Sequence, residues 1–377
     1  MSHVMGVVVD DRSVIRRKLQ GGVRTERRTV VIIPAYNEAA SIQATVESVH
    51  AQTVQPSIII VAANNCTDET EDVARASGAV VFIAEPNKQK KAGALNLTLN
   101  FVMRYLRNND AVLIMDADTT LSETFIETAL SRLNENVGGV GGAFIGRDSD
   151  STIGTLQRME YHRYRKDIIR NGERAFVLSG TGTLFSVKAL RTVKASRNGK
   201  TLPKGGDFYD TFSLTEDNEI TLALLACGYE CISPTQMTTT TDVMESLGAL
   251  WNQRDRWYLG ALWNLRAYGL RMPWYMKMVY WKQQIGLFVS VMAFFLYITL
   301  MGVLILNGGS ISWSPFWISL MVIVVAERVY TVWGMGWKAR LYAALLVEQM
   351  YSILLCMIFF VALLKCIAGK KGHWVPT

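Results

Sequence analysis

The first 135 residues alternate short apolar runs with longer segments of mixed polarity. Runs that are apolar throughout are typical of strands buried on both faces of a parallel sheet. The segments between them, at about 39–52, 67–77 and 92–105, are predicted to be helices. Four strand-and-helix repeats in succession predict a doubly wound, mostly parallel α/β sheet. The predicted strands are residues 29–34, 57–63, 79–84 and 111–115.

The pattern changes near residue 280, where long apolar segments replace the alternation. Residues 285–306 are unbroken and uncharged, and at 1.5 Å per helical residue they reach across a hydrocarbon core of roughly 30 Å. This stretch predicts a transmembrane helix. Shorter apolar segments at 311–326 and 349–364 leave two topologies open: three crossings, or two crossings with interfacial helices around 337–351. The second keeps the C-terminal tail in the cytosol, and we favour it.

Composition supports residence in a membrane, because 50% of the residues are hydrophobic and the mean hydropathy is +0.17. The net charge of +7 does not indicate a nucleic-acid partner, since the basic residues cluster in an N-terminal arm and beside the apolar segments. The arm, residues 1–28, is predicted to be flexible or a surface helix. It lacks the apolar core of a secretory signal.

The segment 251–282 places the preceding α/β domain in the cytosol. Its only acid is Asp255, and the cytosolic flanks of transmembrane helices carry an excess of Lys and Arg. We therefore expect a multi-pass protein of the cytoplasmic membrane. In the cytosol the five cysteines are expected to be free thiols, with neither a disulfide nor a zinc site. The basic residues of the segment are Arg254, Arg256, Arg266, Arg271, Lys277 and Lys282.

Two aspartates follow the predicted strand 111–115 directly. Asp116 and Asp118 lie at its carboxyl end, which is where open α/β sheets bind ligands. Residues two apart in an extended segment point the same way, so both carboxylates can face one hard divalent cation that holds the phosphates of a nucleotide. The alternative is a strand-end turn with two solvated acids.

Further polar residues stand at the ends of the other strands. Glu38 lies in a strand-to-helix turn and can reach a ligand or serve the helix N-terminus. Asn64 can hydrogen-bond a base edge, whereas Asp68 is better explained as a helix cap. Lys91 begins a helix beside the sheet and can meet a diphosphate, although three lysines in four residues usually mark a solvated loop.

A second acidic pair, Glu216 and Asp217, opens a predicted helix that runs to about residue 227. Ser213 and Glu216 have the spacing of a capping box, which gives Glu216 a structural alternative. A structural role is less expected for Asp217, because one capping residue does not require a second acid beside it. Residues 179–183, SGTGT, allow a close backbone approach to a ligand or form a bulged strand.

Other chemistries find little support. A dinucleotide-binding fold would need G-x-G-x-x-G after the first strand, where AYNEAA stands instead. The four histidines are scattered and there is no G-x-S-x-G, so a serine-hydrolase triad is disfavoured.

Seven motifs in this order resemble the membrane-integrated synthases of glycosyltransferase family 2, such as cellulose, chitin, hyaluronan and poly-N-acetylglucosamine synthases. The resemblance covers about residues 29–270. TED followed some 35 residues later by QRDRW is its most specific part. The motifs are PAYNE at 34–38, NNCTD at 64–68, KAGALN at 91–96, DAD at 116–118, SGTGT at 179–183, TED at 215–217 and QRDRW at 253–257.

The resemblance implies an α/β domain of the GT-A type, followed by interfacial helices and a C-terminal transmembrane helical region. It also implies an inverting, metal-dependent glycosyltransferase that moves a sugar from a UDP-sugar to a growing oligo- or polysaccharide. The expected segments are an arm at 1–28, a GT-A domain at 29–240, interfacial helices at 241–282, transmembrane or interfacial helices at 283–368 and a tail at 369–377.

Roles follow from the same resemblance, residue by residue. Asp116 and Asp118 would hold Mg²⁺ or Mn²⁺ against UDP, and Asp217 would be the catalytic base with Glu216 beside it in the substrate site. Trp257 would help form the acceptor platform. The remaining substrate contacts would be Tyr36, Glu38 and Asn64 around uracil and ribose, and Lys91, Gln253 and Arg256 toward the diphosphate, with Arg254 also in the substrate site.

Two departures qualify the match. The family often carries an aspartate pair after the second strand, whereas this chain has Ala63 and Asn64. The family also commonly has transmembrane helices before the catalytic domain, and here there are none. Either the chain forms a homo-oligomer, or its product is short and is not secreted by this protein.

Two rival functions remain. One keeps the fold but transfers a single sugar to a polyprenyl-phosphate carrier; a phosphate acceptor needs no base and no QRDRW platform, so the sequence disfavours it. The other is a non-catalytic membrane scaffold, which the intact acids Asp116, Asp118 and Asp217 disfavour.

Overall fold

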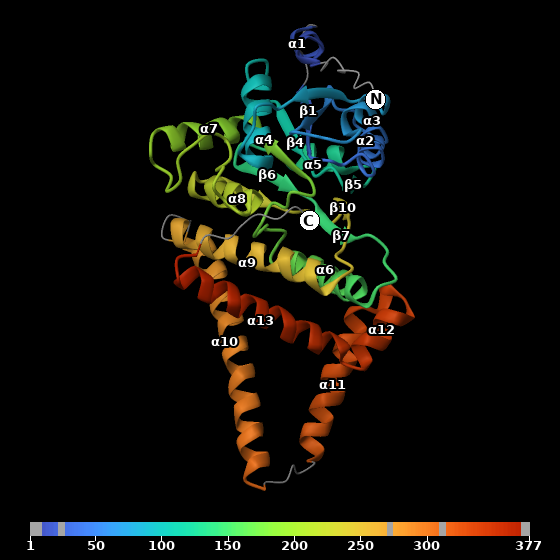
Figure 1. Ribbon diagram of the computed structural model, residues 1–377, viewed down its shortest axis with the longest axis vertical. Coiled ribbons are helices and arrows are strands. Elements are labelled where there is room, and N and C mark those ends of the chain that lie inside the picture. The colour runs from blue at the N-terminus through green and yellow to red at the C-terminus, as the bar shows by residue number, and fades with distance from the viewer. Residues whose placement is uncertain (1–9, 22–26, 270–273, 309–313, 371–377) are drawn as a thin grey trace, which may run out of the picture. The chain divides into compact units, whose positions relative to one another are not determined.

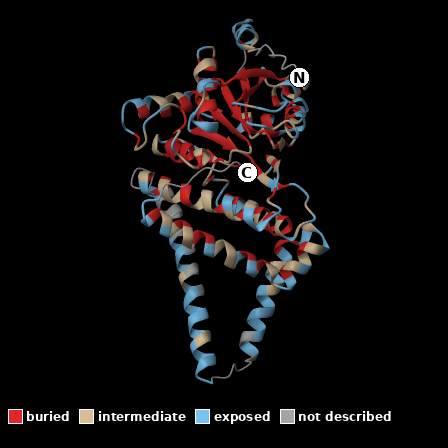
Figure 2. Cartoon of the chain, viewed as in Figure 1, coloured by how far each residue is buried: buried red, intermediate tan, exposed pale blue. Residues whose placement is uncertain are grey.

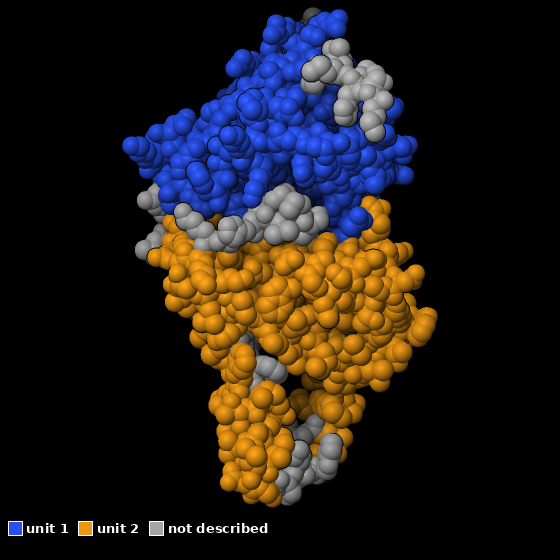
Figure 3. Space-filling view, viewed as in Figure 1, with its two compact units in different colours: residues 1–145, 168–242 blue, residues 146–167, 243–377 orange. Residues whose placement is uncertain are grey.

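The computed structural model describes residues 10–21, 27–269, 274–308 and 314–370 (Figure 1). The chain forms two compact units, shown in different colours in Figure 3. The first unit comprises Met1–Ile145 and Ile168–Asp242, and the second comprises Gly146–Asp167 and Val243–Thr377. Arg271, His373 and Trp374 lie outside the described residues.

The first unit is built on a sheet with strand order β3-β2-β1-β4-β8-β6-β9. The four N-terminal strands pair in parallel, and Ile32 of β1 lies between Ile60 of β2 and Ile114 of β4. β8 runs antiparallel to both β4 and β6, whereas β6 and β9 are parallel. The predicted doubly wound, mostly parallel sheet is confirmed. The strands are β1 (Thr29–Ala35), β2 (Ile58–Ala63), β3 (Val80–Ile83), β4 (Ala111–Ile114), β6 (Val137–Gly141), β8 (Thr183–Ser186) and β9 (Glu230–Ile232).

Helices pack against this sheet, and the sheet itself is almost wholly buried (Figure 2). Every residue of β1, β2, β3 and β4 is buried, which is why these runs are apolar throughout. The helices of the first unit are α1 (Arg12–Gln20), α2 (Ile42–His50), α3 (Thr70–Ala76), α4 (Lys90–Val102), α5 (Phe125–Arg132), α7 (Val187–Asn198) and α8 (Glu216–Ala226).

A small second sheet has the order β5-β10-β7. Its strands are β5 (Thr120–Leu121), β7 (Ala143–Gly146) and β10 (Thr238–Thr241). β5 and β10 are antiparallel, with Leu121 opposite Thr239. This pairing fixes the chain shortly after Asp118, so the segment between β4 and β5 is held at both ends.

The N-terminal arm contains a helix, α1. A surface helix is one of the two alternatives predicted for this arm. Ile15 and Leu19 are buried on its inner face. The Asp11 backbone N–H donates to the Val81 carbonyl at 3.2 Å, and the Arg12 guanidinium donates to the Ile83 carbonyl at 3.1 Å. Because Val81 and Ile83 belong to the edge strand β3, α1 protects that edge from pairing with another chain.

The second unit consists largely of helices. α9 and α13 pack along each other, and the rings of Tyr258 and Phe359 meet edge to face with centroids 5.5 Å apart. Lys365 of α13 pairs with Asp255 of α9 at 2.8 Å. The elements are α6 (Thr152–Arg170), which continues into the first unit, α9 (Leu247–Tyr268), α10 (Trp274–Leu306), α11 (Pro315–Thr331), η1 (Trp333–Met335), α12 (Trp337–Ala344) and α13 (Val347–Ile367).

The apolar segments predicted from hydropathy are helical where they are described. Residues 285–306 lie within α10, residues 314–326 within or just before α11, and residues 349–364 within α13. By length and composition, one helix among the described residues could cross a membrane: Val347–Ile367, with a mean hydropathy of 2.4. A shorter apolar stretch is Phe295–Leu306. Multiple crossings therefore remain a prediction.

Candidate active site

The two aspartates lie at the carboxyl edge of the parallel half of the sheet. The Met115 N–H donates to the Ile32 carbonyl at 3.2 Å, which continues the pairing of β4 with β1. The next N–H, that of Asp116, donates to the Gly180 carbonyl at 3.0 Å. The chain thus turns from β1 toward the SGTGT segment at the position of Asp116. Asp116 and Asp118 are the first polar side chains after the buried strand.

Lys91 joins this pair to α8. Its ammonium lies 2.5 Å from Oδ1 of Asp116 and 2.8 Å from Oε1 of Glu216. Although burial lowers the pKa of Lys91, these two carboxylates hold that pKa well above its usual range, so the side chain is cationic. Lys91 comes from the first turn of α4, Asp116 follows β4 and Glu216 begins α8, so three distant segments meet here.

The carboxyl of Asp118 is harder to ionise than that of an ordinary aspartate. Burial, and then the charge of Asp116, raise its pKa to about 6. Paired carboxylate oxygens of this kind fit a hard divalent cation, which would relieve their repulsion. Among the described residues no three acidic, histidine or cysteine side chains converge on one point, so phosphate and water oxygens would complete the shell. That donor set suits Mg²⁺ or Mn²⁺ bound together with a nucleotide.

Asp217 occupies the second position of α8, next to Glu216. Its carboxylate accepts the Asn218 N–H at 2.7 Å and the Gly180 N–H at 3.4 Å. Burial, and then the charge of Glu216, raise the pKa of Asp217 to about 6. A carboxylate with a pKa close to neutral is suited to accept a proton from a substrate hydroxyl at physiological pH.

The capping-box interpretation of Glu216 is wrong. That motif would put the N-cap at Ser213 and Glu216 in the third helical position. The N-cap of α8 is Thr215, so Glu216 is the first helical residue, and its carboxylate pairs with Lys91. Asp68 is not the N-cap predicted for it, but its carboxylate does bond to the backbone at the start of α3. Its carboxylate accepts the N–H groups of Thr70 at 3.1 Å and Ala39 at 3.2 Å, although the N-cap itself is the next residue.

The residues predicted to surround the nucleotide follow β1 and β2, which are neighbours in the sheet. Asn64 is buried and its side-chain oxygen accepts the Asn87 amide at 2.7 Å. Glu38 accepts the Ser41 hydroxyl at 2.7 Å. Burial raises the pKa of Glu38, as does the charge of Asp116, which places the two acids within electrostatic reach. Tyr36 is 42% exposed and available to a ligand.

Gly180 explains why the SGTGT segment is rich in glycine. A Cβ at this position would lie 3.0 Å from Oδ2 of Asp116 and 3.0 Å from Nζ of Lys91. Any side chain would therefore enter the acidic site. The backbone at Gly180 therefore lies close to Asp116 and Lys91, and its approach to a ligand remains a prediction.

The QRDRW residues lie on α9, in the second unit. Arg254 is buried and forms a two-pronged ion pair with Glu160, with distances of 2.9 and 2.8 Å. Its guanidinium also lies 4.6 Å from the ring centroid of Trp257. Oε1 of Gln253 and Nε of Arg256 are buried and have no hydrogen-bond partner among the described residues. Contacts of Gln253, Arg254, Arg256 and Trp257 with a substrate remain predictions.

Sequence reasoning missed Tyr209. This buried residue lines a small cavity together with Lys91, Gly180, Glu216 and Asp217. Burial raises the pKa of its phenol far above the usual range. The side chain of Asn96 holds the Tyr209 backbone with two hydrogen bonds, of 2.8 and 2.9 Å. The motif KAGALN ends at Asn96, but nothing in the sequence links it to a residue more than a hundred positions away.

This sheet, with a paired aspartate at its carboxyl edge and a second acidic pair beside a lysine, has the arrangement that the motifs predict for a GT-A domain. The family model for "Glycosyltransferase like family 2" matches residues 27–260, and the chain belongs to this family. The family and the fold class expected from the motifs are confirmed.

Among its relatives are the poly-β-1,6-N-acetyl-D-glucosamine synthases of Staphylococcus epidermidis and Staphylococcus aureus. Each is 26% identical over 237 residues, which cover 61% of this chain and 53% of the relative. The chain thus spans about half the length of these curated relatives. A solved structure, the mannosyltransferase PcManGT from Pyrobaculum calidifontis in complex with GDP-Man and Mn²⁺, has a similar fold. Its TM-score is 0.61 at 18% identity, over 96% of this chain and 94% of that chain.

Proposed function

We propose that this protein is an inverting, metal-dependent glycosyltransferase that moves a sugar from a UDP-sugar to a growing oligo- or polysaccharide at the membrane. One observation carries the proposal. Lys91 pairs with Asp116, one of two aspartates suited to a metal, and with Glu216, the residue before Asp217. The raised pKa of Asp217 suits it to act as a base. The residues that would stabilise the leaving group therefore lie next to the segment that carries the residue that would remove the proton.

The leaving-group side consists of Asp116, Asp118 and Lys91. The two aspartates would hold Mg²⁺ or Mn²⁺, which supplies positive charge to the departing diphosphate when bound. The Lys91 ammonium is held within 3 Å of two carboxylates and can turn to the phosphate oxygens as negative charge develops there. The presence of Mn²⁺ in the complex of PcManGT with GDP-Man supports a divalent cation here.

The proton-transfer side is Asp217. A carboxylate at this position would remove the proton of the acceptor hydroxyl while that oxygen attacks the anomeric carbon. Attack from the face opposite the diphosphate inverts the configuration of that carbon. Glu216 keeps Lys91 beside the base and, through its charge, helps raise the pKa of Asp217.

The second unit is assigned the remaining substrate contacts. The buried Nε of Arg256 and the buried Oε1 of Gln253 have no hydrogen-bond partner in the described chain. The first can donate to a phosphate oxygen and the second can accept a ligand hydroxyl, so Gln253 would reach the diphosphate through its side-chain NH₂ group instead. We assign both residues to the diphosphate and Trp257 to the acceptor platform. Arg254, already paired with Glu160, would contribute its charge rather than a direct bond.

The sugar is proposed from the relatives. The poly-β-1,6-N-acetyl-D-glucosamine synthases support UDP-N-acetylglucosamine as the donor. Its uracil and ribose would lie beside Tyr36, Glu38 and Asn64. The complex of PcManGT with GDP-Man makes GDP-mannose the donor to test against it.

We propose that α10 and α11 form the crossings of a multi-pass protein in the cytoplasmic membrane, with the first unit in the cytosol. Most residues of both helices whose burial is described are exposed (Figure 2). Among their apolar residues, Ile305 is 65% exposed and Val322 is 58% exposed. Although α13 is long and apolar enough to cross a membrane, we assign it to the membrane surface, because Glu348 pairs with Arg163 at 2.5 Å and Lys365 pairs with Asp255. Charges held by protein partners at both ends keep this helix against α6 and α9. Homo-oligomers would supply a wider passage for product.

The test is release of UDP or GDP by the purified full chain in detergent, with Mn²⁺ or Mg²⁺. Donors are UDP-GlcNAc, UDP-Glc, UDP-GlcA, UDP-Gal and GDP-mannose. We expect one UDP-sugar to be turned over and Asp217→Asn to abolish transfer while still binding UDP. The matched control is Asp207→Asn, an ordinary ion-paired acid of the same unit. Undiminished transfer by Asp217→Asn would refute the base, and a product wholly extractable into organic solvent would favour a polyprenyl-phosphate acceptor.

A further inference from the structure

The loop between α7 and α8 carries an unusual apolar side chain. Phe212 is 92% exposed. The next most exposed large hydrophobic residue of the first unit, as far as that unit is described, is Ile169 at 57%. An aromatic ring so fully in solvent gains nothing from folding and leaves its apolar surface available to a ligand, and it stands five positions before Asp217.

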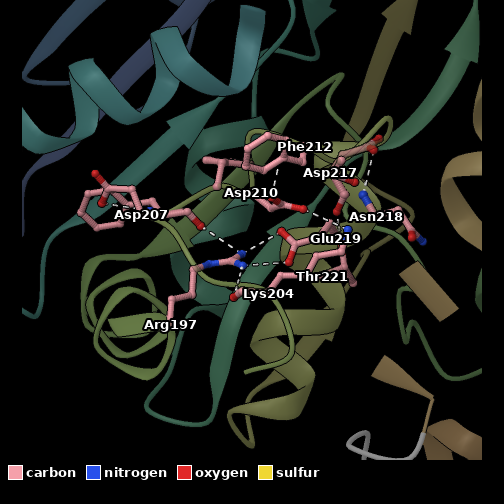
Figure 4. A network of polar contacts seen from close by, with 12 residues as sticks. Arg197, Lys204, Asp207, Asp210, Phe212, Asp217, Asn218, Glu219 and Thr221 are labelled. Carbon is pink, nitrogen blue, oxygen red and sulfur yellow. Dashed lines mark hydrogen bonds and ion pairs between the residues drawn. The ribbon is translucent and has the colours of Figure 1, made fainter. Parts of the chain in front are cut away.

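A buried ion pair holds this loop in place. Arg197, at the end of α7, pairs with Glu219 of α8 at 2.9 and 2.7 Å, and neither side chain has any exposed surface. The same guanidinium donates to the carbonyls of Lys204 at 3.3 Å and Phe208 at 3.4 Å (Figure 4). One interior cation thus ties two points of the loop to the helix that bears Asp217.

A second set of contacts fixes the residues next to Phe212. Lys204 pairs with the buried Asp210 at 2.9 Å, and Asp210 accepts the Phe212 backbone N–H at 3.1 Å. Asn96 also holds Tyr209, through two hydrogen bonds to its backbone. The exposed ring therefore projects from a loop that is anchored immediately before it.

The anchored loop also leads directly into the base. Ser213 bonds to the backbone of Thr215, the N-cap of α8, and Asp217 follows two residues later. Figure 4 shows Phe212 and Asp217 at the N-terminal end of α8, with Arg197 and Glu219 beneath the loop. An exposed aromatic ring and a proton acceptor are thus carried by one short, rigid segment.

We propose that Phe212 is a stacking surface for the sugar ring of the acceptor, an inference that rests on the proposed function. One face of a pyranose ring is lined by C–H groups and fits an aromatic ring, while its hydroxyls remain free to meet a base such as Asp217. Because the loop is ordered before binding, little conformational entropy is lost when the acceptor arrives. Phe212 would select carbohydrate acceptors and set their position.

The test is the split between acceptor and donor kinetics in the full-length enzyme. The acceptor probe is a β-1,6-linked N-acetylglucosamine pentasaccharide, and nucleotide release is followed with the donor that the enzyme turns over. We expect Phe212→Ala to raise the KM for the pentasaccharide roughly five- to tenfold and to change the KM for the donor by less than about twofold. Phe212→Trp should restore most of the acceptor affinity. Ile169→Ala, which removes an exposed apolar side chain elsewhere, should change neither KM.

Three results would overturn the inference. One is an unchanged acceptor KM in Phe212→Ala. Another is a loss of activity accompanied by a lower Tm that Phe212→Trp does not repair, because that would show a structural role. The third is a wild-type enzyme that turns over its donor but gains no rate from the pentasaccharide. A wild-type enzyme that turns over no nucleotide-sugar at all would instead refute the proposed function.

Discussion

Replacing Asp217 with Asn should stabilise the protein while abolishing transfer. Burial and the charge of Glu216 move the pKa of Asp217 from 3.8 to about 6, so ionising this carboxyl costs more in the folded chain than in the unfolded one. The full shift corresponds to about 3 kcal/mol of unfolding free energy at pH 8. Because the side chain is partly exposed and Asn binds the Asn218 and Gly180 N–H groups more weakly, we expect a net gain of about 1–3 kcal/mol.

The sign of the pH dependence follows from the raised pKa. Above pH 6 the carboxyl is ionised in both states and the full penalty applies, whereas below about pH 4 it is protonated in both and the penalty disappears. The difference in Tm between Asp217→Asn and wild type, measured by differential scanning fluorimetry in detergent, should be largest at pH 8 and vanish near pH 4. A gain of roughly 2–4 °C per kcal/mol is expected for a domain of this size.

Asp207→Asn is a control of opposite sign. Asp207 is half-buried and pairs with Lys194 at 2.7 Å, so its loss should lower the Tm slightly. If Asp217→Asn is no more stable than wild type at pH 8, or if its effect does not depend on pH, then the pKa of Asp217 is not raised as described above.

Three further predictions follow from the same contacts. Transfer should fall as the pH drops through about 6, because Asp217 must be ionised to accept a proton; a pH–rate profile that is flat from 5 to 8 would contradict this assignment. Lys91→Met should bind Mn²⁺ about tenfold more tightly in the absence of nucleotide, as measured by electron paramagnetic resonance, because the ammonium 2.5 Å from Asp116 no longer competes; equal or weaker binding would exclude that competition. Arg197→Met should lose about 3–5 kcal/mol of unfolding free energy in chemical denaturation, since Glu219 is left as a buried charge, and Arg197→Met combined with Glu219→Leu should recover most of it; additive losses would argue against the pair.

The site could be predicted from the sequence where a residue follows a strand. β4 is apolar throughout and ends just before Asp116, so the carboxyl edge of a parallel sheet is the expected place for both aspartates. Lys91 lies in the first turn of the helix that follows β3, and that helix begins at the same edge. Their common position follows from strand and helix periodicity alone, without knowledge of any contact.

Contacts between distant segments could not be predicted in this way. Glu216 fits a capping box by spacing, and only the third dimension shows that Lys91 is its partner. The antiparallel course of β8 through the sheet, and the support of Tyr209 by Asn96, likewise depend on tertiary packing. The charges of Arg197 and Glu219 suggest surface residues, yet both are fully buried because each neutralises the other.

The most direct test of the metal-dependent transferase is calorimetric binding of UDP to the full chain, with and without Mn²⁺. The wild-type protein should bind UDP at least about tenfold more tightly when Mn²⁺ is present. Asp118→Asn should lose that enhancement, whereas Asp207→Asn should keep it. UDP affinity that is indifferent to Mn²⁺, or an enhancement that survives in Asp118→Asn, would contradict the assignment of Asp116 and Asp118 as the site of a nucleotide-bound metal.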